Sequence, residues 1–578
     1  MAPTDDMKLG NGSRVAVIGG GPAGTLFSYF LLDMAARNDM SVKLDIYEPR
    51  RFSTTFGPAG CNMCGGIISE SLVQLLAAEG INLPPTIVQR GIDSYILHTD
   101  LGRVQIEPPG HEKRIAAIHR GAGPRGLTVS EWGSFDGYLL DLARDKGASV
   151  IEQRVEAVDL SVASPRIKTG KEESDPYDLI VVAVGVNSTL LKSFASMPSY
   201  KPPATTRTYI SEYLLGRDTI DLYLGSSMHV FLLDLPRLEF AAIIPKGEFA
   251  TVCLLGSEID KELIDAFFAA SEVRECFPPD WQQATAQCQC SPAINIAGPA
   301  VPFADRIAFI GDSGVNRLYK DGIGGAYRTA KAAANTAIFN GVSAEAFRRG
   351  FAPTCGAISW DNRIGRIVFM VTKVIQKIAF GRRALLGMTF NEQNNPSIPS
   401  RMSGVLWDTF TGSASYRDVF LRTLHPVFLI RLIYESLAGV IPQLGGDSGR
   451  FRRKRMRKGE LGKIYLPGET IIRQGEEGSS MFVVQSGRVE VIRQSEQGEV
   501  RLAELGPGEI FGEMALFGNK IRSATVRPLE EVRVLTIDKK IFMQKIHEDP
   551  SLAFRVMQKM SQRIRNLNEE LGKIRNHV

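Results

Sequence analysis

Hydrophobic and polar positions divide the chain into three zones. Up to about Gly341, short apolar runs of strand length alternate with helical patterns, which predicts an α/β domain. From there to about Gly459 the pattern is helical, apolar and basic. Beyond it, short alternating runs cut by glycines predict a β region that a final helix closes. Because a single core stops growing at roughly 250–300 residues, a chain of 578 residues is expected to form two or three domains.

A strand at 15–18, a glycine-rich turn and a helix at 25–32 form the first unit of the α/β zone. The turn contains Gly19, Gly21, Pro22, Ala23 and Gly24. Such glycines allow a tight turn, close approach of a pyrophosphate and close packing of helix on strand, while the helix N-terminus offers N–H groups to phosphates. Glu48 ends the second predicted strand, 44–48, where a carboxylate can accept ribose hydroxyls. The unit predicts dinucleotide binding.

A distant segment indicates which dinucleotide binds. A strand at 308–310 leads into Gly311 and Asp312, and a helix at 327–339 is opened by Gly322, Gly324 and Gly325. With these motifs, Arg14 to Gly341 resembles the p-hydroxybenzoate hydroxylase-type flavoproteins, which include aromatic hydroxylases and geranylgeranyl reductases. The resemblance implies a Rossmann-type FAD domain with an inserted β-rich substrate region. It also implies that Asp312 binds ribityl hydroxyls and that the helix start faces the flavin ring.

The electron donor is less sharply indicated. Residues 178–188 resemble the middle motif of the same flavoprotein class, but Val184 stands where that class has aspartate. In the hydroxylases this motif serves both FAD and reduced nicotinamide, so the substitution weakens the case for direct NAD(P)H use. There is no second glycine fingerprint. We therefore expect the electron donor to be NAD(P)H that binds transiently, or a protein electron carrier.

Cys61 and Cys64 follow the second strand in a loop that resembles the cysteine-bearing loop of geranylgeranyl reductases, which makes them the catalytic candidates. A Cys-x-x-Cys pair also suits dithiol chemistry, half of a zinc site or plain packing. No second ligand pair with zinc spacing is present, so no metal is expected. Residues 240–247 stand where those reductases carry a lipid-lining strand, of which the proline and Lys246-Gly247 match. Arg120 opens a basic glycine-rich loop that suits an anionic headgroup or a surface turn.

These patterns favour an FAD-dependent oxidoreductase in which reduced flavin delivers a hydride to an apolar, prenyl or lipid-like substrate. The enzyme alternative is an FAD-dependent monooxygenase. The alternative from another class is a redox and cyclic-nucleotide sensor that acts through a partner interface.

Residues 508–526 are closely similar to the phosphate-binding cassette of cyclic-nucleotide-binding domains of the Crp and protein kinase A regulatory type. The similarity implies that Glu513 accepts the ribose 2′-hydroxyl and Arg522 pairs with the phosphate. Gly512, Ser523 and Ala524 would supply further donors. We expect cAMP or cGMP to act as an effector of the oxidoreductase. Retention of this domain as a docking piece is the alternative.

Charge and cysteine content restrict the partners and the compartment. A net charge of +5 is small for this length and does not indicate nucleic acid. Segments 364–388 and 419–435 predict basic amphipathic helices that pack on the flavin domain or lie on a membrane surface, without spanning it. Seven cysteines without a secretory signal predict a reducing, cytoplasmic location, with peripheral attachment to the inner face of the membrane as an option. The apolar stripe of the last helix suits a homodimer, or packing within the chain.

The predicted domain boundaries follow from these zones. They are a disordered N-terminus at 1–12, an FAD-binding oxidoreductase domain at 13–345 with its substrate region at about 90–130 and 200–295, a helical region at 346–449, a basic linker at 450–459 and a cyclic-nucleotide-binding β-roll with flanking helices at 460–578.

Overall fold

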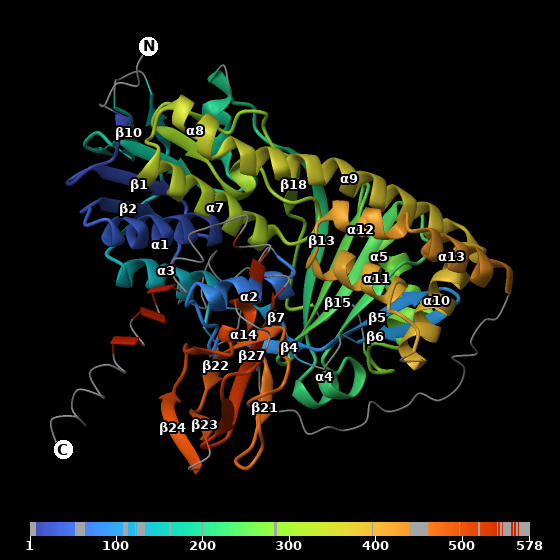
Figure 1. The fold of residues 1–578 in the computed structure, drawn as a ribbon. Coiled ribbons are helices and arrows are strands. Elements are labelled where there is room, and N and C mark those ends of the chain that lie inside the picture. The colour runs from blue at the N-terminus through green and yellow to red at the C-terminus, as the bar shows by residue number, and fades with distance from the viewer. Residues whose placement is uncertain are drawn as a thin grey trace. The chain divides into compact units, whose positions relative to one another are not determined.

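The computed structural model groups the chain into two compact units (Figure 1). The first unit contains Met1–Ser69, Pro85–His111 and Ile115–Gly459, and the second contains Glu70–Pro84, Glu112–Arg114 and Glu460–Val578. The structure describes all residues except 1–6, 53–63, 108–111, 113, 122, 124–132, 161–163, 171, 198–199, 282–285, 396, 439–460, 496–497, 518–520, 540–541, 544–545, 547–556, 559, 562–563 and 566–578.

The two units differ from the predicted domains in a few segments. Residues 70–84 and 112–114, which the sequence assigns to the oxidoreductase domain, belong with the C-terminal β region. The helical region from 346 is part of the first unit. Within the predicted disordered terminus, Met7 accepts a backbone hydrogen bond from Val342 and Gly12 donates one to Ser41, so the ordered fold begins before residue 13.

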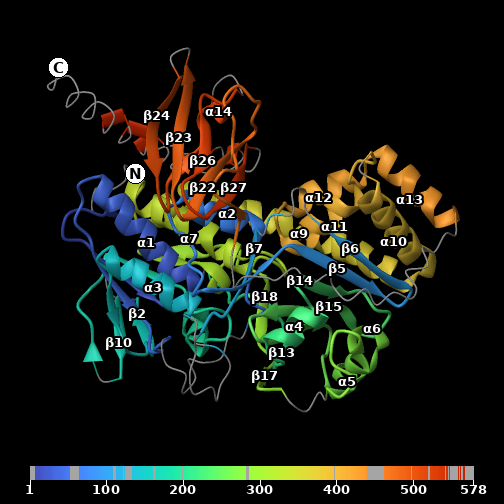
Figure 2. The same ribbon diagram turned by 90° about the horizontal axis from the view of Figure 1, so that it is seen from below.

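A six-stranded sheet forms the α/β part of the first unit. Its order is β19-β20-β12-β1-β2-β8, parallel except at the β19 edge. The strands are β1 (Arg14–Ile18), β2 (Lys43–Tyr47), β8 (Ser149–Ile151), β12 (Leu179–Val182), β19 (Phe303–Ala304) and β20 (Ile307–Phe309). Helices α1 (Pro22–Arg37), α3 (Phe135–Asp145) and α7 (Gly322–Phe339) lie along it (Figures 1 and 2). The predicted strand–turn–helix is therefore present.

An eight-stranded sheet forms the rest of the first unit. It runs β17-β13-β16-β15-β14-β5-β6, with β18 also paired to β13. The strands are β5 (Ser94–Thr99), β6 (Gly102–Ile106), β13 (Ala204–Leu214), β14 (Ser227–Phe231), β15 (Leu238–Lys246), β16 (Phe249–Gly256), β17 (Cys288–Cys290) and β18 (Ala293–Ala297). These residues fall in the β-rich segments that the sequence predicts at 90–130 and 200–295. A separate three-stranded sheet has the order β3 (Ile67–Ile68), β7 (Ile115–Ile118) and β4 (Val88–Ile92).

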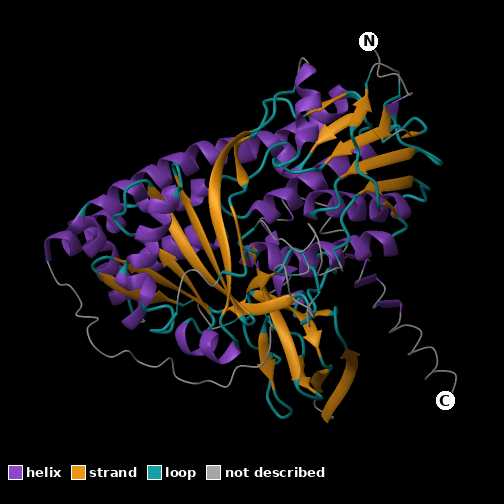
Figure 3. Cartoon of the chain, turned by 180° about the vertical axis from the view of Figure 1, so that it is seen from behind, coloured by secondary structure: helices purple, strands orange, loops and turns teal. Residues whose placement is uncertain are grey.

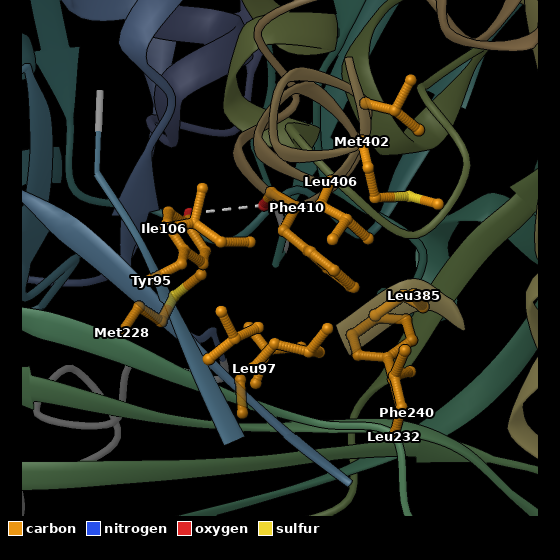
Figure 4. Close-up of a cluster of buried hydrophobic side chains, with 14 of the residues drawn as sticks. Tyr95, Leu97, Ile106, Met228, Leu232, Phe240, Leu385, Met402, Leu406 and Phe410 are labelled. Carbon is orange, nitrogen blue, oxygen red and sulfur yellow. Dashed lines mark hydrogen bonds between the residues drawn. The ribbon is translucent and has the colours of Figure 1, made fainter. Parts of the chain in front are cut away.

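Each face of the eight-stranded sheet carries its own apolar core, because successive strand residues point to opposite faces. Helices α4 (Arg217–Tyr223), α5 (Lys261–Ala269) and α6 (Ser271–Arg274) contribute to one core together with Phe231. The other core joins the sheet to helices of the C-terminal half of the first unit. Figure 4 shows Leu97 and Phe240 of the sheet near Leu385 and Phe410 of those helices. Figure 3 separates the strand and helix layers by colour.

The helical region consists of α8 (Ala344–Gly350), α9 (Ala352–Lys377), α10 (Ala379–Asn394), α11 (Met402–Thr411), α12 (Tyr416–Thr423) and α13 (Pro426–Ala438). Its buried side chains pack on the sheet, as the packing alternative predicts. Several large apolar side chains remain exposed on α9 and α13, among them Met370, Val374, Ile430 and Ile433. Membrane-surface contact stays a prediction. Among the described residues, no helix combines the length and apolar character needed to span a membrane.

The second unit has two sheets, β21-β27-β22-β25 and β24-β23-β26, as the predicted β-roll requires. The strands are β21 (Lys463–Tyr465), β22 (Ser480–Ser486), β23 (Val489–Ser495), β24 (Gly498–Leu505), β25 (Ile510–Phe511), β26 (Thr525–Pro528) and β27 (Val532–Asp538). Helices α14 (Met514–Phe517) and α2 (Glu70–Ala78) complete it. Most of the predicted C-terminal helix lies outside the described residues, so its role in a dimer stays a prediction.

Candidate functional site

The glycine turn after β1 is built from close backbone contacts. Gly19 has φ +110°, and a Cβ there would lie 2.6 Å from the carbonyl oxygen of Ala183. A Cβ on Gly24 would lie 2.0 Å from the carbonyl oxygen of Gly19. Both positions therefore need glycine, for the turn and for packing of α1. The amide of Gly20 donates to Glu48 Oε2 at 2.9 Å, which joins the turn to the end of β2.

A cavity of about 900 Å³ in the first unit brings most of the predicted cofactor residues together. Its lining includes Gly19, Gly21, Pro22, Ala23, Glu48, Cys64, Asp312 and Gly322. Four other predicted glycines do not line the cavity but lie at positions where a side chain would collide with neighbouring atoms: Gly24, Gly311, Gly324 and Gly325. A Cβ on Gly311 would lie 2.7 Å from Ala23 Cβ, and one on Gly325 would lie 1.7 Å from Asn316 Oδ1. Cys61 lies outside the described residues.

Glu48 is only 2% exposed, and its carboxylate already has a cationic partner. The Arg50 guanidinium donates to both of its oxygens, at 2.8 and 2.9 Å. This pairing fixes the position of the carboxylate at the cavity wall. Its predicted role toward ribose hydroxyls uses the remaining acceptor capacity of the two oxygens.

Arg120 lies beside the glycine turn: a Cβ on Gly21 would be 3.3 Å from Arg120 Nη2. Its guanidinium pairs with Asp136 at 2.7 Å, where α3 begins. Burial alone would lower the pKa of Arg120, but the charge of Asp136 outweighs this effect and raises it. A permanently charged, oriented guanidinium at the turn suits a pyrophosphate. Of the two sequence interpretations, a surface turn does not describe Arg120 itself, which lines the cavity.

Asp312 follows β20 and faces the same cavity. Asn316 Nδ2 donates to its Oδ1 at 2.5 Å and also to the carbonyl of Gly322 at 3.1 Å, so Asn316 holds the start of α7 to the carboxyl group. Burial raises the pKa of Asp312, which opposes the lowering by Asn316 and Arg120. The position suits a hydroxyl-rich ligand, because hydroxyls can donate to the carboxylate.

The arrangement fits FAD. The turn leaves room for a pyrophosphate, Arg120 supplies a cation, and Glu48 and Asp312 supply acceptors at separate strand ends. Ligands of doubly wound sheets bind at the carboxyl ends of the strands, where these residues lie.

The remaining wall of the cavity is apolar. Phe240, Ala242 and Ile244 alternate along β15 and face the cavity, as does Met228 of β14. Alternation along one strand explains why these three line it together. The segment that the sequence indicated as an apolar surface therefore forms part of this wall.

Lys320 is a cavity residue that sequence reasoning missed. Its Nζ lies 4.0 Å from the centroid of the Phe240 ring and 5.7 Å from that of Phe410. Burial lowers the pKa of Lys320 to about 8. A lysine between a strand and a helix start has no motif of its own, so the sequence offers no signal for it.

Cys64 and Cys253 are the described thiols that line the cavity. Cys64 Sγ accepts a hydrogen bond from the amide of Gly66 at 3.3 Å. Cys253 of β16 lies near the same loop, since a Cβ on Gly65 would be 3.2 Å from its Sγ. Burial raises the pKa of Cys253 to about 12, which keeps it a neutral thiol. The sequence could not show that Cys253, so far along the chain, lies near Cys64.

The second unit gathers the five predicted nucleotide-binding residues around one loop. Gly512 has φ +77°, and a Cβ there would lie 2.7 Å from Arg522 Nη1. That same nitrogen donates to the carbonyls of Ser480 and Gly512, at 2.8 and 2.9 Å. Glu513 is 8% exposed and contributes to the electrostatic environment of Arg522. Ser523 and the buried Ala524 directly follow Arg522.

Comparison with solved structures finds a protein of similar fold. A flavoprotein/dehydrogenase from Cytophaga hutchinsonii matches with a TM-score of 0.50 and 14% identity, over 74% of this chain and 100% of that one. A likeness at this identity shows the fold alone.

Residues 463–549 match the family model described as the cyclic nucleotide-binding domain, so the chain carries a domain of that family. The type II regulatory subunit of cAMP-dependent protein kinase from Drosophila melanogaster is 32% identical over 148 residues, which is 25% of this chain and 37% of that protein. The cyclic AMP receptor protein of Thermus thermophilus is 34% identical over 110 residues, 19% of this chain and 51% of that protein. The chain thus matches about half or less of the length of these relatives.

The glycine turn gives a first prediction. Gly24→Ala is expected to weaken FAD binding about 5- to 150-fold, because overpacking costs about 1–3 kcal/mol. Flavin absorbance per purified chain and FAD titration measure this effect. Gly356→Ala in α9 is the matched control: no atom lies within 4 Å of its added Cβ. It should retain FAD and gain up to about 1 kcal/mol of stability. Full FAD affinity in Gly24→Ala would contradict the assignment.

A second prediction concerns the loop around Gly512 and Arg522. Arg522→Ala is expected to weaken cAMP binding about 10- to 100-fold, since a hydrogen bond to a charged group contributes about 1.5–3 kcal/mol. Calorimetric titration of the full chain measures it. Arg527→Ala is the control, because Arg527 is a half-buried arginine of the same unit that pairs with Glu499 at 2.7 Å. Circular dichroism checks that both variants fold. Equal cAMP affinity in the two variants would overturn the role of Arg522.

Proposed function

We propose that the protein is an FAD-dependent oxidoreductase that reduces an apolar, prenyl or lipid-like substrate and is regulated by a cyclic nucleotide. One observation carries the proposal. A single cavity joins a polar part, with the glycine turn, Arg120 and Asp312, to an apolar wall from the eight-stranded sheet. The first part fits FAD and the second fits a substrate with little to hydrogen-bond. The fold likeness to a flavoprotein supports the same conclusion.

Reduced FAD, when bound, supplies the hydride for such a reaction. The chain must then provide the proton, exclude water and orient the substrate. Lys320 meets the first requirement, because a pKa of about 8 leaves it protonated near neutral pH yet able to release the proton. Phe240, Ala242 and Ile244 exclude water from the apolar wall. The hydride from bound reduced FAD and the proton from Lys320 would together add across one double bond of the substrate. NAD(P)H or a protein carrier would return the electrons.

Cys64 remains a substrate-contact candidate in this proposal, since it lines the cavity. Cys61, the other predicted catalytic residue, lies outside the described part of the chain. The monooxygenase alternative uses the same cavity, and the sensor alternative uses the same flavin and nucleotide sites without turnover.

A third prediction tests the reaction. Anaerobically reduced protein mixed with geranylgeranyl diphosphate or a polyprenol should be reoxidised, and the product should gain two hydrogens per double bond by mass spectrometry. Incorporation of ¹⁸O from labelled dioxygen would instead support the monooxygenase. No reoxidation by any prenyl or lipid compound would contradict the proposed reductase.

The proton step sharpens this test. If Lys320 is the donor, flavin reoxidation by the substrate should slow as pH rises through about 8, because the ammonium form is lost there. Lys320→Met should lower the rate about 100-fold and remove this limb of the pH profile. Lys331→Met is the control: Lys331 is also buried, at 5% exposure, but lies against Phe30 and does not line the cavity. An unchanged pH limb in Lys320→Met would contradict the role.

The proposed regulation rests on how the chain connects the two units. Ser69 lines the cavity, and its hydroxyl donates to Asp321 at 2.7 Å. The next residue, Glu70, begins α2, which belongs to the second unit. The chain also leaves the second unit at Arg114 and enters β7 at Ile115.

The two connections enter the first unit on paired strands. In β3 and β7, Ile67 pairs with Ala117 and Ile68 with Ala116. Ile67, like Ser69, lines the cavity. Any shift of α2 relative to β3 is therefore transmitted covalently to the cavity wall.

Arg114 fixes this connection to the β-roll within the second unit. It contacts Glu112 at 3.1 Å, Glu70 at 3.3 Å and Asp538 at 2.5 Å. In addition, the amide of Thr536 donates to Glu112 Oε1 at 2.8 Å. The end of β27 is thus joined to the start of α2 through one arginine.

The fourth prediction follows from this cluster. In the wild-type chain, cAMP should change the rate of substrate-dependent flavin reoxidation by about fivefold or more, a typical coupling. Arg114→Gln should retain FAD and cAMP affinity but reduce this effect to less than about twofold. Arg501→Gln is the control, because Arg501 pairs with Glu490 and Glu504 within the β-roll alone. Full cAMP response in Arg114→Gln would contradict this route of coupling.

A further inference from the structure

His98, His229 and Cys276 form a buried cluster in the first unit that has no role in the proposed reaction. Their exposures are 1%, 2% and 2%. His98 Nε2 lies 2.9 Å from His229 Nδ1, and Cys276 Sγ lies 3.3 Å from the same Nδ1. All three potential ligand atoms lie within 4.8 Å of one another.

The eight-stranded sheet brings the cluster together. His98 lies on β5 and His229 on β14, which are parallel neighbours in which Phe231 pairs with His98 and Ile96 with His229. The two histidines therefore share one face, and their rings stack at a centroid distance of 5.1 Å. Cys276 comes from the segment after α6, which covers that face. None of the three lines the FAD cavity.

The hydrogen-bond partners of the two histidines set their tautomers. His229 Nε2 lies 3.4 Å from the carbonyl oxygen of Leu224, a contact that places the proton on Nε2 and the lone pair of Nδ1 toward the cluster. Without a metal ion, this lone pair accepts a hydrogen bond from His98 Nε2 at 2.9 Å. A hydrogen bond of this kind, from the non-ligating nitrogen to a backbone carbonyl, typically orients a metal-binding histidine.

Charge and ligand number decide which ion fits. Two neutral imidazoles and one thiolate carry a single negative charge, which a monovalent cation cancels. A divalent ion would leave a net positive charge among apolar side chains. Structural zinc also takes four ligands, whereas the described residues supply three here. Thiolate with imidazole is a soft ligand set that selects Cu(I).

We propose that His98, His229 and Cys276 form a three-coordinate site for Cu(I). Binding breaks the Cys276 S–H bond, moves the His98 proton from Nε2 to Nδ1, and forms bonds from copper to Cys276 Sγ, His98 Nε2 and His229 Nδ1. The thiol proton passes to the solvent, and copper enters and stays as Cu(I), so no electron is transferred. The bound ion would tie β5, β14 and the α6 segment together on this face of the sheet.

The test is an anaerobic Cu(I) titration of the full-length, FAD-loaded protein against bicinchoninate, with metal content measured by mass spectrometry after gel filtration. One tightly bound copper per chain is expected, together with a raised melting temperature. Cys276→Ser should lose this copper. Cys355→Ser is the matched control, because Cys355 is another buried cysteine, at 5% exposure, in α9. Copper-edge X-ray absorption should show two nitrogens and one sulfur.

The wild-type titration decides the proposal even where a variant fails to fold. Wild-type protein that retains no copper after gel filtration would overturn the site, and so would equal copper binding by the Cys276→Ser and Cys355→Ser variants. One zinc and no copper per chain, with nitrogen and sulfur ligands, would overturn the choice of a monovalent ion.

Discussion

The close approach of α1 to the end of β1 is the constraint on which the cofactor site depends. Gly24 packs against the carbonyl of Gly19 at a distance that no side chain allows, and Gly19 in turn packs against the carbonyl of Ala183 after β12. These contacts bring the ends of neighbouring parallel strands into one place. Glu48 after β2 and Asp312 after β20 then face the same cavity, although 264 positions in the numbering separate them. The backbone geometry therefore determines where the polar side chains of the site lie.

The alternation of side chains in the eight-stranded sheet has a similar consequence for the rest of the first unit. On β14, Met228 faces the cavity, whereas its neighbour His229 stacks with His98 on the opposite side, where Phe231 belongs to the other core. One strand thus contributes to two separate environments, because successive side chains of a strand point to opposite faces of the sheet. The cavity wall and the buried histidine pair are fixed by the same register between β5 and β14. A slip of one residue would exchange their positions.

The sequence predicts those parts of the site whose chemistry is local. The glycine turn, Glu48, Asp312 and the helix start at Gly322 are recognisable because strand, turn and helix follow one another along the chain. The β-roll and its loop from Gly512 to Ala524 are recognisable for the same reason, and the family match at 463–549 confirms this domain. The FAD and nucleotide roles of the individual residues stay predictions. The substrate does too, because an apolar wall limits the chemistry of a ligand without identifying it.

Residues brought in by long-range pairing could not be predicted. Lys320 acquires its lowered pKa only through burial beside Phe240, some eighty positions away. Cys253 lies near the Cys64 loop only because the sheet places β16 beside that loop. His98, His229 and Cys276 are spread over 179 positions in the numbering and have no common motif. In each case the isolated residue in the sequence is compatible with ordinary packing, and only the sheet gives it a chemical neighbour.

The placement of α2 is the strongest departure from the sequence-based domain boundaries, and it has a physical cause. Every residue of α2, from Glu70 to Ala78, is buried. Its buried polar residues need hydrogen-bond partners, and Gln74 Oε1 accepts a hydrogen bond from the amide of Asp538 at 3.3 Å. The segment therefore folds with the β-roll, while Ser69 stays at the cavity. A domain fused only at its own end would be joined to the first unit by one chain crossing. Here the chain also crosses between the two units at 69/70, 84/85, 111/112 and 114/115, and Ser69 at the first of these lines the cavity.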